Sequence, residues 1–122
     1  MTDRAEAAGS GDSLATAGFH AISEYQRTGS PDVLDTAVTA FQDAVAATPP
    51  GHPDLAGRLS NLEFSLSSRF ERAGNIADLD AAIDAARRAV DLTPPGDPDL
   101  AMYLSNLWLS LFRRFDWSGD AG

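Results

Sequence analysis

Apolar residues recur along this chain at the three-to-four-residue spacing of amphipathic helices. Five segments show this spacing, and proline or glycine lies at their boundaries. We therefore expect helices over about 12–27, 31–47, 53–72, 76–92 and 98–116. Gly29 and Gly74 suit the left-handed position that follows a helix end, while Pro31 suits the first position of the next helix. The pattern predicts an all-α protein with short connections, and short connections make neighbouring helices antiparallel.

The proline-rich turn over 48–55 returns 45 residues later over 93–100. The identity continues into the helix that follows each turn, where Ala56, Leu59, Ser60, Asn61, Leu62, Leu66, Arg69, Phe70 and Gly74 recur as Ala101, Leu104, Ser105, Asn106, Leu107, Leu111, Arg114, Phe115 and Gly119. Internal repeats of this period are typical of stacked helical arrays. Applying the offset backwards brings the helix over 12–27 into the same register. The chain is thus expected to hold two full helical hairpins and half of a third.

The repeat sets the expected domain boundaries. One repeat domain covers 12–119, with a first repeat over about 12–53, a second over about 54–98 and a half repeat over 99–119. Residues 1–11 are small and polar, which favours a flexible N-terminal tail, with an extra turn of the first helix as the alternative. Gly119 is expected to end the last helix, leaving 120–122 as a C-terminal tail.

Composition narrows the class of partner. The 122 residues are enough for one domain, and a formal net charge of −9 argues against nucleic acid, whose phosphates require lysine and arginine. The absence of cysteine excludes disulfides and thiolate metal sites. No apolar run approaches the roughly 20 residues of a membrane span, and the N-terminus lacks a signal-peptide pattern, so we expect a cytoplasmic protein.

The repeats resemble the tetratricopeptide repeat (TPR). Small residues, an aromatic and a closing proline fall at the spacing of that family's second helix, as in Ala37, Phe41, Ala44 and Pro49 and again in Ala82, Ala86, Ala89 and Pro94. The first helix departs from the family, since Glu63 or Trp108 replaces its usual glycine, and the period is 45 rather than 34. The longer form is similar to arrays in actinobacterial multidomain proteins, which often accompany a caspase-like CHAT peptidase or a nucleotide-binding signalling domain.

This resemblance implies a right-handed TPR-like solenoid of five helices that binds a protein or peptide without catalysis. It also implies that one flank of the first helix of each hairpin lines a concave groove. On that flank an apolar ladder recurs at the 45-residue offset, and the expected groove residues are Phe19, Ile22, Phe64, Ser67, Leu109 and Phe112. The alternative is that these side chains pack against the second helix of their own or the next hairpin.

A polar stripe recurs beside this flank. It holds Asn61 and Arg69 in one repeat and Asn106 and Arg114 in the next. Arginine presents paired donors that can hold a carboxylate. The alternative is a solvated face, in which the arginines lie near helix C-termini and are favoured by the helix dipole.

The last helix is apolar around more than half of its circumference. Trp108 and Phe112 replace Glu63 and Ser67 of the previous repeat, and Phe115 and Trp117 extend the apolar surface. A terminal helix of a solenoid normally presents a polar outer face. Three explanations stand: a homodimer formed through this helix, a partner chain that supplies a covering helix, or a longer array of which this chain is a fragment.

The sequence shows no pattern of a catalytic, cofactor or metal site. His20 and His52 are the only histidines, and neither has a second ligand at metal spacing. His52 lies in a proline-rich turn at the place of Asp97, which suits either a helix-capping role or simple exposure to solvent. We expect no enzyme activity, no cofactor and no metal, and propose as alternatives to the groove an oligomerisation element or the regulatory arm of a CHAT-like catalytic domain.

Overall fold

The computed structural model describes residues 4–121, and over this range it consists of helices joined by short connections, without strands. The helices are α1 (Arg4–Thr28), α2 (Pro31–Ala47), α3 (Leu55–Ala73), α4 (Ile76–Leu92) and α5 (Leu100–Ala121). The all-α class and the number of helices agree with the sequence prediction. The bounds of α2 and α4 agree to the residue.

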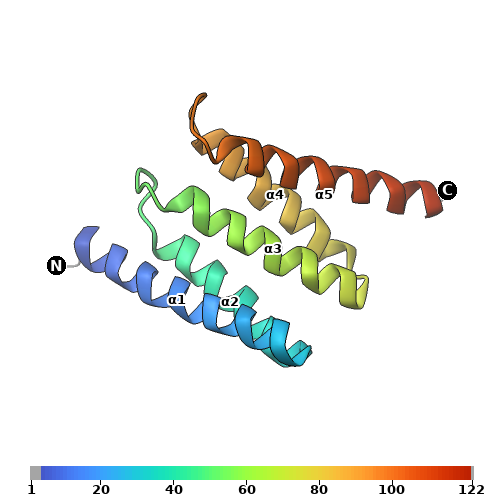
Figure 1. Cartoon of the computed structure of the whole chain (residues 1–122), viewed down its shortest axis with the longest axis horizontal. Helices are drawn as coiled ribbons and strands as arrows, with labels where there is room; N and C mark the ends of the chain where they lie inside the picture. The colour runs from blue at the N-terminus through green and yellow to red at the C-terminus, as the bar shows by residue number, and fades with distance from the viewer. Residues whose placement is uncertain (1–3, 122) are drawn as a thin grey trace.

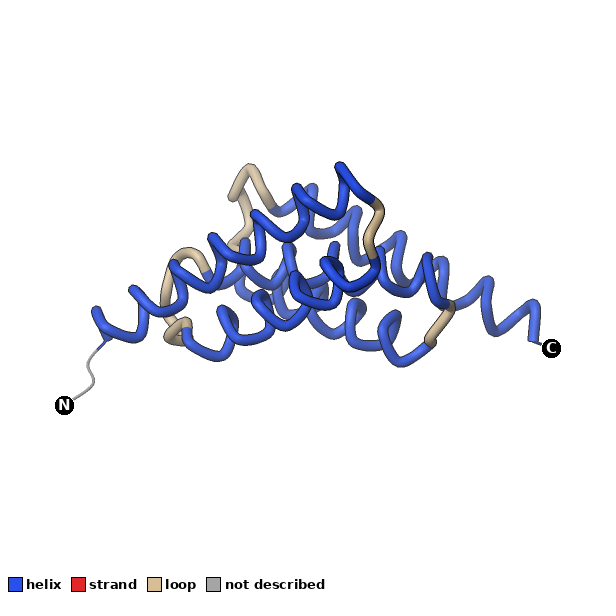
Figure 2. Tube along the Cα trace, turned by 90° about the horizontal axis from the view of Figure 1, so that it is seen from below, coloured by secondary structure: helices blue, strands red, loops and turns tan. Residues whose placement is uncertain are grey.

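The helices form two layers. In Figure 1, α1, α3 and α5 lie side by side in the near layer, while α2 and α4 return behind them. Each helix packs against its neighbours in the chain, and α3 also contacts α5. Figure 2 shows the short connections and the two chain ends on opposite sides. The near layer is thus made of the three helices that share the 45-residue register.

Glycine and asparagine end α3 and start α4 as the sequence suggests. Gly74 has φ 73° and Gly29 has φ 69°, the left-handed backbone that costs glycine little. The Gly74 amide donates to the Phe70 carbonyl, and the Asn75 side chain accepts from the Ala77 amide. These local bonds explain why the bounds of α4 were predictable.

The two proline-rich turns are built alike. His52 Nδ1 accepts from the Asp54 amide at 3.0 Å, and Asp97 Oδ1 accepts from the Asp99 amide at 2.8 Å. His52 thus orders the turn before α3, but it does not cap the helix, since its partner is the N-cap residue Asp54 and α3 has no side-chain cap bond. The turns extend two residues further than predicted, so that α3 begins at Leu55 and α5 at Leu100 rather than at the prolines.

Both outer helices are longer than predicted. The tail expected over 1–11 is helical from Arg4, while residues 1–3 lie outside the described part. Gly11 is buried, and a Cβ there would lie 2.6 Å from Arg58 Nη1 and 2.9 Å from Thr48 Oγ1. Gly11 is therefore a contact point between α1 and the α2–α3 turn rather than a helix breaker.

Gly119 does not end α5, which continues to Ala121 and so includes the first two residues of the tail predicted over 120–122. The contrast with Gly74 has a simple cause. After Gly74 the chain turns back to pack α4 on α3, whereas no described segment packs on α5 in that way.

The core lies between the layers. Leu59, Leu62 and Leu66 of α3 meet small residues of α4 and aromatic residues of α2 and α5. The other members of this buried cluster are Val38, Phe41, Leu55, Ala82, Ala85, Ala89 and Tyr103. Burying a leucine side chain contributes about 1.5–3 kcal/mol. The α3 leucines therefore fix how α4 lies across the near layer.

Candidate interaction surfaces

The predicted apolar ladder lies on the surface. Phe19, Phe64 and Leu109 are exposed by 51, 45 and 47%. Phe19 also meets Phe41 of α2 edge-on, with ring centroids 5.5 Å apart. Both alternatives for Phe19, an exposed groove residue and a side chain packed on the second helix, thus hold in part. One edge of its ring packs on α2, while the rest stays open to solvent.

An open cleft of about 490 Å³ adjoins Phe19. Gly57 and Asn61 of α3 and Tyr103 of α5 also line it. Arg58 closes one end, where its buried guanidinium donates to Thr48 Oγ1 at 2.6 Å and pairs with Asp12 of α1. The cleft therefore spans the near layer and touches all three of its helices.

Two of the predicted groove residues do not lie on this surface. Ser67 is buried and donates to Glu63 Oε1 at 3.0 Å, while Ile22 is half-buried against the core. Ser67 faces inward because the buried Glu63 carboxyl needs hydrogen-bond donors. Phe112, the last of the six, is 52% exposed.

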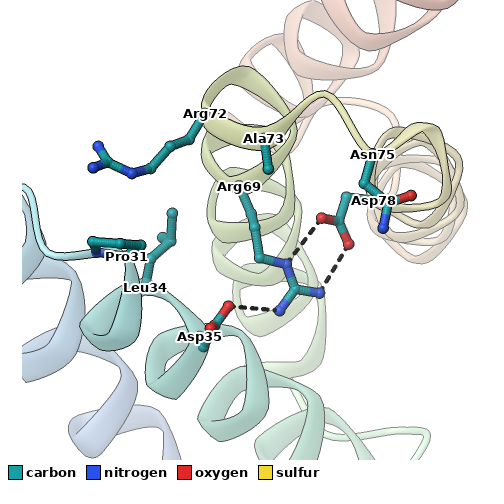
Figure 3. Close-up of a pocket in the computed structure, with 8 residues that line it drawn as sticks. All are labelled: Pro31, Leu34, Asp35, Arg69, Arg72, Ala73, Asn75 and Asp78. Carbon is teal, nitrogen blue, oxygen red and sulfur yellow. Dashed lines mark hydrogen bonds and ion pairs between the residues drawn. The ribbon is translucent and has the colours of Figure 1, made fainter.

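The arginines of the polar stripe are occupied by the protein's own carboxylates. Arg69 donates from Nε to Asp78 Oδ2 at 2.9 Å and from Nη2 to Asp78 Oδ1 at 2.8 Å, and its Nη1 reaches Asp35 Oδ1 at 3.2 Å (Figure 3). The hydrogen bond with Asp78 raises the pKa of Arg69. Arg69 therefore bridges α2, α3 and α4, and an external carboxylate would have to displace one of these aspartates.

The next repeat reproduces half of this arrangement. Arg114 Nε donates to Asp80 Oδ1 at 2.8 Å, which matches the Arg69–Asp35 pair at the 45-residue offset. Among the described contacts, the place of Asp78 is taken by the Ser118 hydroxyl at 2.7 Å and by the Trp117 ring, 5.3 Å from the guanidinium carbon. Among the described side chains, Arg114 thus has one carboxylate partner where Arg69 has two.

The two asparagines of the stripe have different surroundings. Asn61 is half-buried and lines the cleft beside Phe19, whereas Asn106 Nδ2 lies 3.5 Å from Ser60 Oγ, between α5 and α3.

A buried glutamate, which sequence reasoning did not single out as a site, joins α3 to α5. Glu63 Oε1 accepts from Ser67 Oγ at 3.0 Å and from Ser110 Oγ of α5 at 3.2 Å. Burial raises the pKa of Glu63, and the two serine hydrogen bonds oppose this shift. The signal in the sequence was a single acidic residue where the neighbouring repeats have Gly18 and Trp108.

The largest apolar surface lies on α5. Of the eleven exposed large apolar side chains among the described residues, eight are on this helix. Five of them form one stripe, which we call the open stripe: Leu104, Trp108, Leu111, Phe112 and Phe115. Trp108 and Phe112 stack on each other with ring centroids 5.4 Å apart. All four residues of the predicted terminal interface, which includes Trp117, are exposed.

The same register positions are covered in α3. Leu59 and Leu66 are 0 and 2% exposed, whereas Leu104 and Leu111 are 47 and 40% exposed. The residue types are identical, so the difference comes from the neighbours: α4 covers this side of α3. The open stripe therefore corresponds in register to the surface of α3 that α4 covers.

Comparisons with known proteins found no relative of this chain. No protein-family model matches the chain, and neither a curated protein nor a solved structure is significantly similar to it. In the described part of the chain, His, Cys, Asp and Glu side chains do not gather in threes that could hold a metal ion. Within residues 4–121 no helix combines the length and apolar character needed to cross a bilayer.

Proposed function

We propose that this chain is a non-catalytic protein-interaction module of TPR-like repeats, and that the open stripe of α5 is its main binding surface. The observation that carries the proposal is the exposure of Leu104, Trp108, Leu111, Phe112 and Phe115 at positions that are buried or half-buried in α3. Phenylalanine and tryptophan can each bury roughly 150–250 Å². A stripe with three of them exceeds the few hundred Å² of contiguous apolar surface that a monomer ordinarily exposes.

The repeated ion pairs support the stacked arrangement on which the proposal rests. Arg69 with Asp35 and Arg114 with Asp80 join successive repeats at the same register, in addition to the repeated leucines. A stack of this kind repeats its helix-to-helix contacts from one unit to the next. The open stripe of α5 is then suited to a helix like α4, which covers the same register positions of α3.

The apolar ladder of the near layer is the second candidate surface. Phe19, Phe64 and Leu109 are half-exposed on the near layer in one register, which would suit an apolar or amphipathic peptide laid across α1, α3 and α5. The ladder offers fewer apolar side chains than the open stripe, so we rank it second.

A displayed peptide library distinguishes the two surfaces. Selection is run on the wild type, on Trp108→Glu/Phe112→Ser, which installs the residue types of α3, and on Phe64→Ala. We expect enriched peptides to bind the wild type and Phe64→Ala but not the α5 double variant. All these side chains are exposed, so the variants should keep their helix content and melting temperature, which circular dichroism checks.

Enriched peptides that bind all three proteins equally would overturn the proposed surface. Peptides that require Phe64 but tolerate the α5 double variant would move the site to the apolar ladder of the near layer.

A further inference from the structure

We infer that the partner of α5 is an amphipathic helix of another protein with the chemistry of α4, namely a carboxylate in its first turn and small residues along its apolar face. The inference rests on the proposed function, because it specifies what binds the open stripe. Its steps follow from the two helix interfaces in the described chain whose register matches the open stripe, those of α2 on α1 and of α4 on α3.

The first step concerns charge. Asp78 lies in the first turn of α4 and holds Arg69 through two hydrogen bonds of 2.9 and 2.8 Å. Arg114 has the register of Arg69, and it pairs with Asp80 of α4 as Arg69 pairs with Asp35 of α2. In the place where Arg69 meets Asp78, Arg114 meets only Ser118 and Trp117 among the described residues. A helix that lies on α5 as α4 lies on α3 brings its first-turn carboxylate to Arg114. Paired hydrogen bonds between a guanidinium and a carboxylate are strong and directional.

The second step concerns size. At the register of Gly18 and Glu63, the contact between the near and far layers pairs one bulky side chain with one small one. Gly18 of α1 faces Phe41 of α2, so closely that a Cβ on Gly18 would lie 2.7 Å from the ring. One repeat later the pair is reversed, since Glu63 and Ala86 line the same small cavity. In the third repeat the near-layer residue is Trp108, the largest of the three. The covering helix therefore needs alanine or glycine at the register of Ala86.

The third step concerns the source of this helix. The small apolar residues on the packed faces of α1, α2 and α4 are buried: Ala15 and Ala21 are 7% exposed, Ala37 and Ala44 are 0% exposed, and Ala82 and Ala89 are 0 and 1% exposed. A second copy would have to open its own core to present any of these faces. The open stripe of a second copy consists of bulky side chains and would place them against Trp108 and Phe112, so a helix of another protein fits better.

The test uses the sequence of α4 as a probe. A blocked peptide of residues 75–93 contains no tryptophan, whereas the two tryptophans of the protein, Trp108 and Trp117, both lie on α5. Titration of the peptide into the full chain should shift tryptophan emission to the blue in a saturable way. Asp78→Asn in the peptide should weaken binding at least about tenfold, because a hydrogen bond to a charged group is lost.

Matched protein variants locate the contact. Arg114→Gln should abolish the difference between the two peptides. Arg113→Gln, which changes the neighbouring arginine that pairs with Glu71 at 2.5 Å, should preserve it. An Ala86→Phe peptide should bind at least about tenfold more weakly to the wild type, because Trp108 leaves no room for a second ring.

A 19-residue peptide is only marginally helical by itself. A second experiment therefore attaches the helix covalently to the chain, which gives it a high effective concentration. Residues 75–93 are appended directly after Gly119, in place of 120–122, which copies the Gly74–Asn75 junction. The extended chain should melt at a higher temperature than the wild type and emit further to the blue, and both gains should shrink with Arg114→Gln.

Equal binding of the unchanged peptide and its Asp78→Asn variant, or an extended chain with unchanged melting and emission, would overturn the inference. So would a wild type that light scattering shows to be a dimer dissociated by Trp108→Glu/Phe112→Ser, since a second copy would then occupy the stripe. Binding that needs the open stripe but ignores Arg114 sinks this inference alone, whereas binding that ignores the stripe altogether sinks the proposed function as well.

Discussion

At the scale of single residues, the register position shared by Gly18, Glu63 and Trp108 distinguishes the three repeats. Gly18 leaves room for the Phe41 ring, Glu63 lines a small cavity together with Ala86, and Trp108 is 63% exposed. One position thus serves in turn as a contact for an aromatic ring, as a buried hydrogen-bond acceptor and as an exposed apolar surface.

Glu63 makes the stability of the fold depend on pH. Its pKa is raised in the folded state by burial, so the folded state holds this proton more tightly than the unfolded chain. The stabilisation by neutral Glu63 is therefore full below the unfolded pKa of about 4.3 and is lost as pH rises through the raised folded value. We expect Glu63→Gln to gain stability relative to the wild type as pH rises across this window.

Urea unfolding at a series of pH values measures this difference. The control is Glu71→Gln, which changes an exposed carboxylate of the same helix. A difference between Glu63→Gln and the wild type that stays constant with pH would contradict the assignment.

A double-mutant cycle tests the size pairing. Gly18→Glu places a carboxylate against the Phe41 ring and should destabilise the wild type by about 2–3 kcal/mol. In a Phe41→Ala background the pair becomes the one that Glu63 and Ala86 form, so the same change should cost at least about 1 kcal/mol less. Additive costs of the two changes would show that the positions do not share space.

At the scale of elements, α3 and α5 are nearly the same helix in two environments. Their leucines coincide in register, yet Leu66 is 2% exposed and Leu111 is 40% exposed. The difference follows from α4, which packs on α3 and finds no counterpart on α5 among the described residues.

Truncating the same leucine in α3 and in α5 measures how much packing by α4 contributes to the free energy of unfolding. Leu66→Ala should destabilise the protein by about 2–4 kcal/mol, because it leaves a cavity between α3 and α4. Leu111→Ala, the same change 45 residues later, should cost less than about 1 kcal/mol. Chemical denaturation of both variants checks the contrast, and equal costs would mean that the open stripe is covered in solution.

Sequence patterns predicted the elements well where local bonds define them. The bounds of α2 and α4 follow from Gly29, Pro31, Gly74 and Asn75, whose effects act within a few residues. The ends of α1 and α5 were wrong for a tertiary reason. Gly11 is helical because it packs against Arg58 and Thr48, and Gly119 remains helical because no described helix folds back there.

The candidate sites were predictable in part. Helical register placed Phe64, Leu109 and Phe112 on the surface, as the structure has them. It also placed Ser67 there, although Ser67 is buried, since register does not reveal that Glu63 would turn inward and require donors. The aspartates that hold Arg69 and Arg114 come from other helices, so no local pattern could assign them.

At the scale of the whole molecule, the two layers leave one large surface without a counterpart among the described residues. The far layer holds α2 and α4, each lying between neighbours of the near layer, while α5 has a far-layer neighbour on one side only. Helix α5 carries most of the exposed large apolar side chains, including Trp108, and it also carries Arg114, which lacks a counterpart of Asp78 among the described residues. We therefore expect binding at α5 to be read most directly from its own tryptophans.

Acrylamide quenching of Trp108 and Trp117 fluorescence, at concentrations where light scattering gives the mass of one chain, is the most direct test. Because these side chains are 63 and 41% exposed, we expect ready quenching in the free chain and marked protection when the peptide of residues 75–93 is added. Tryptophans already shielded in the free single chain, or equally quenched with and without the peptide, would contradict the claim that α5 presents an open helix-binding surface.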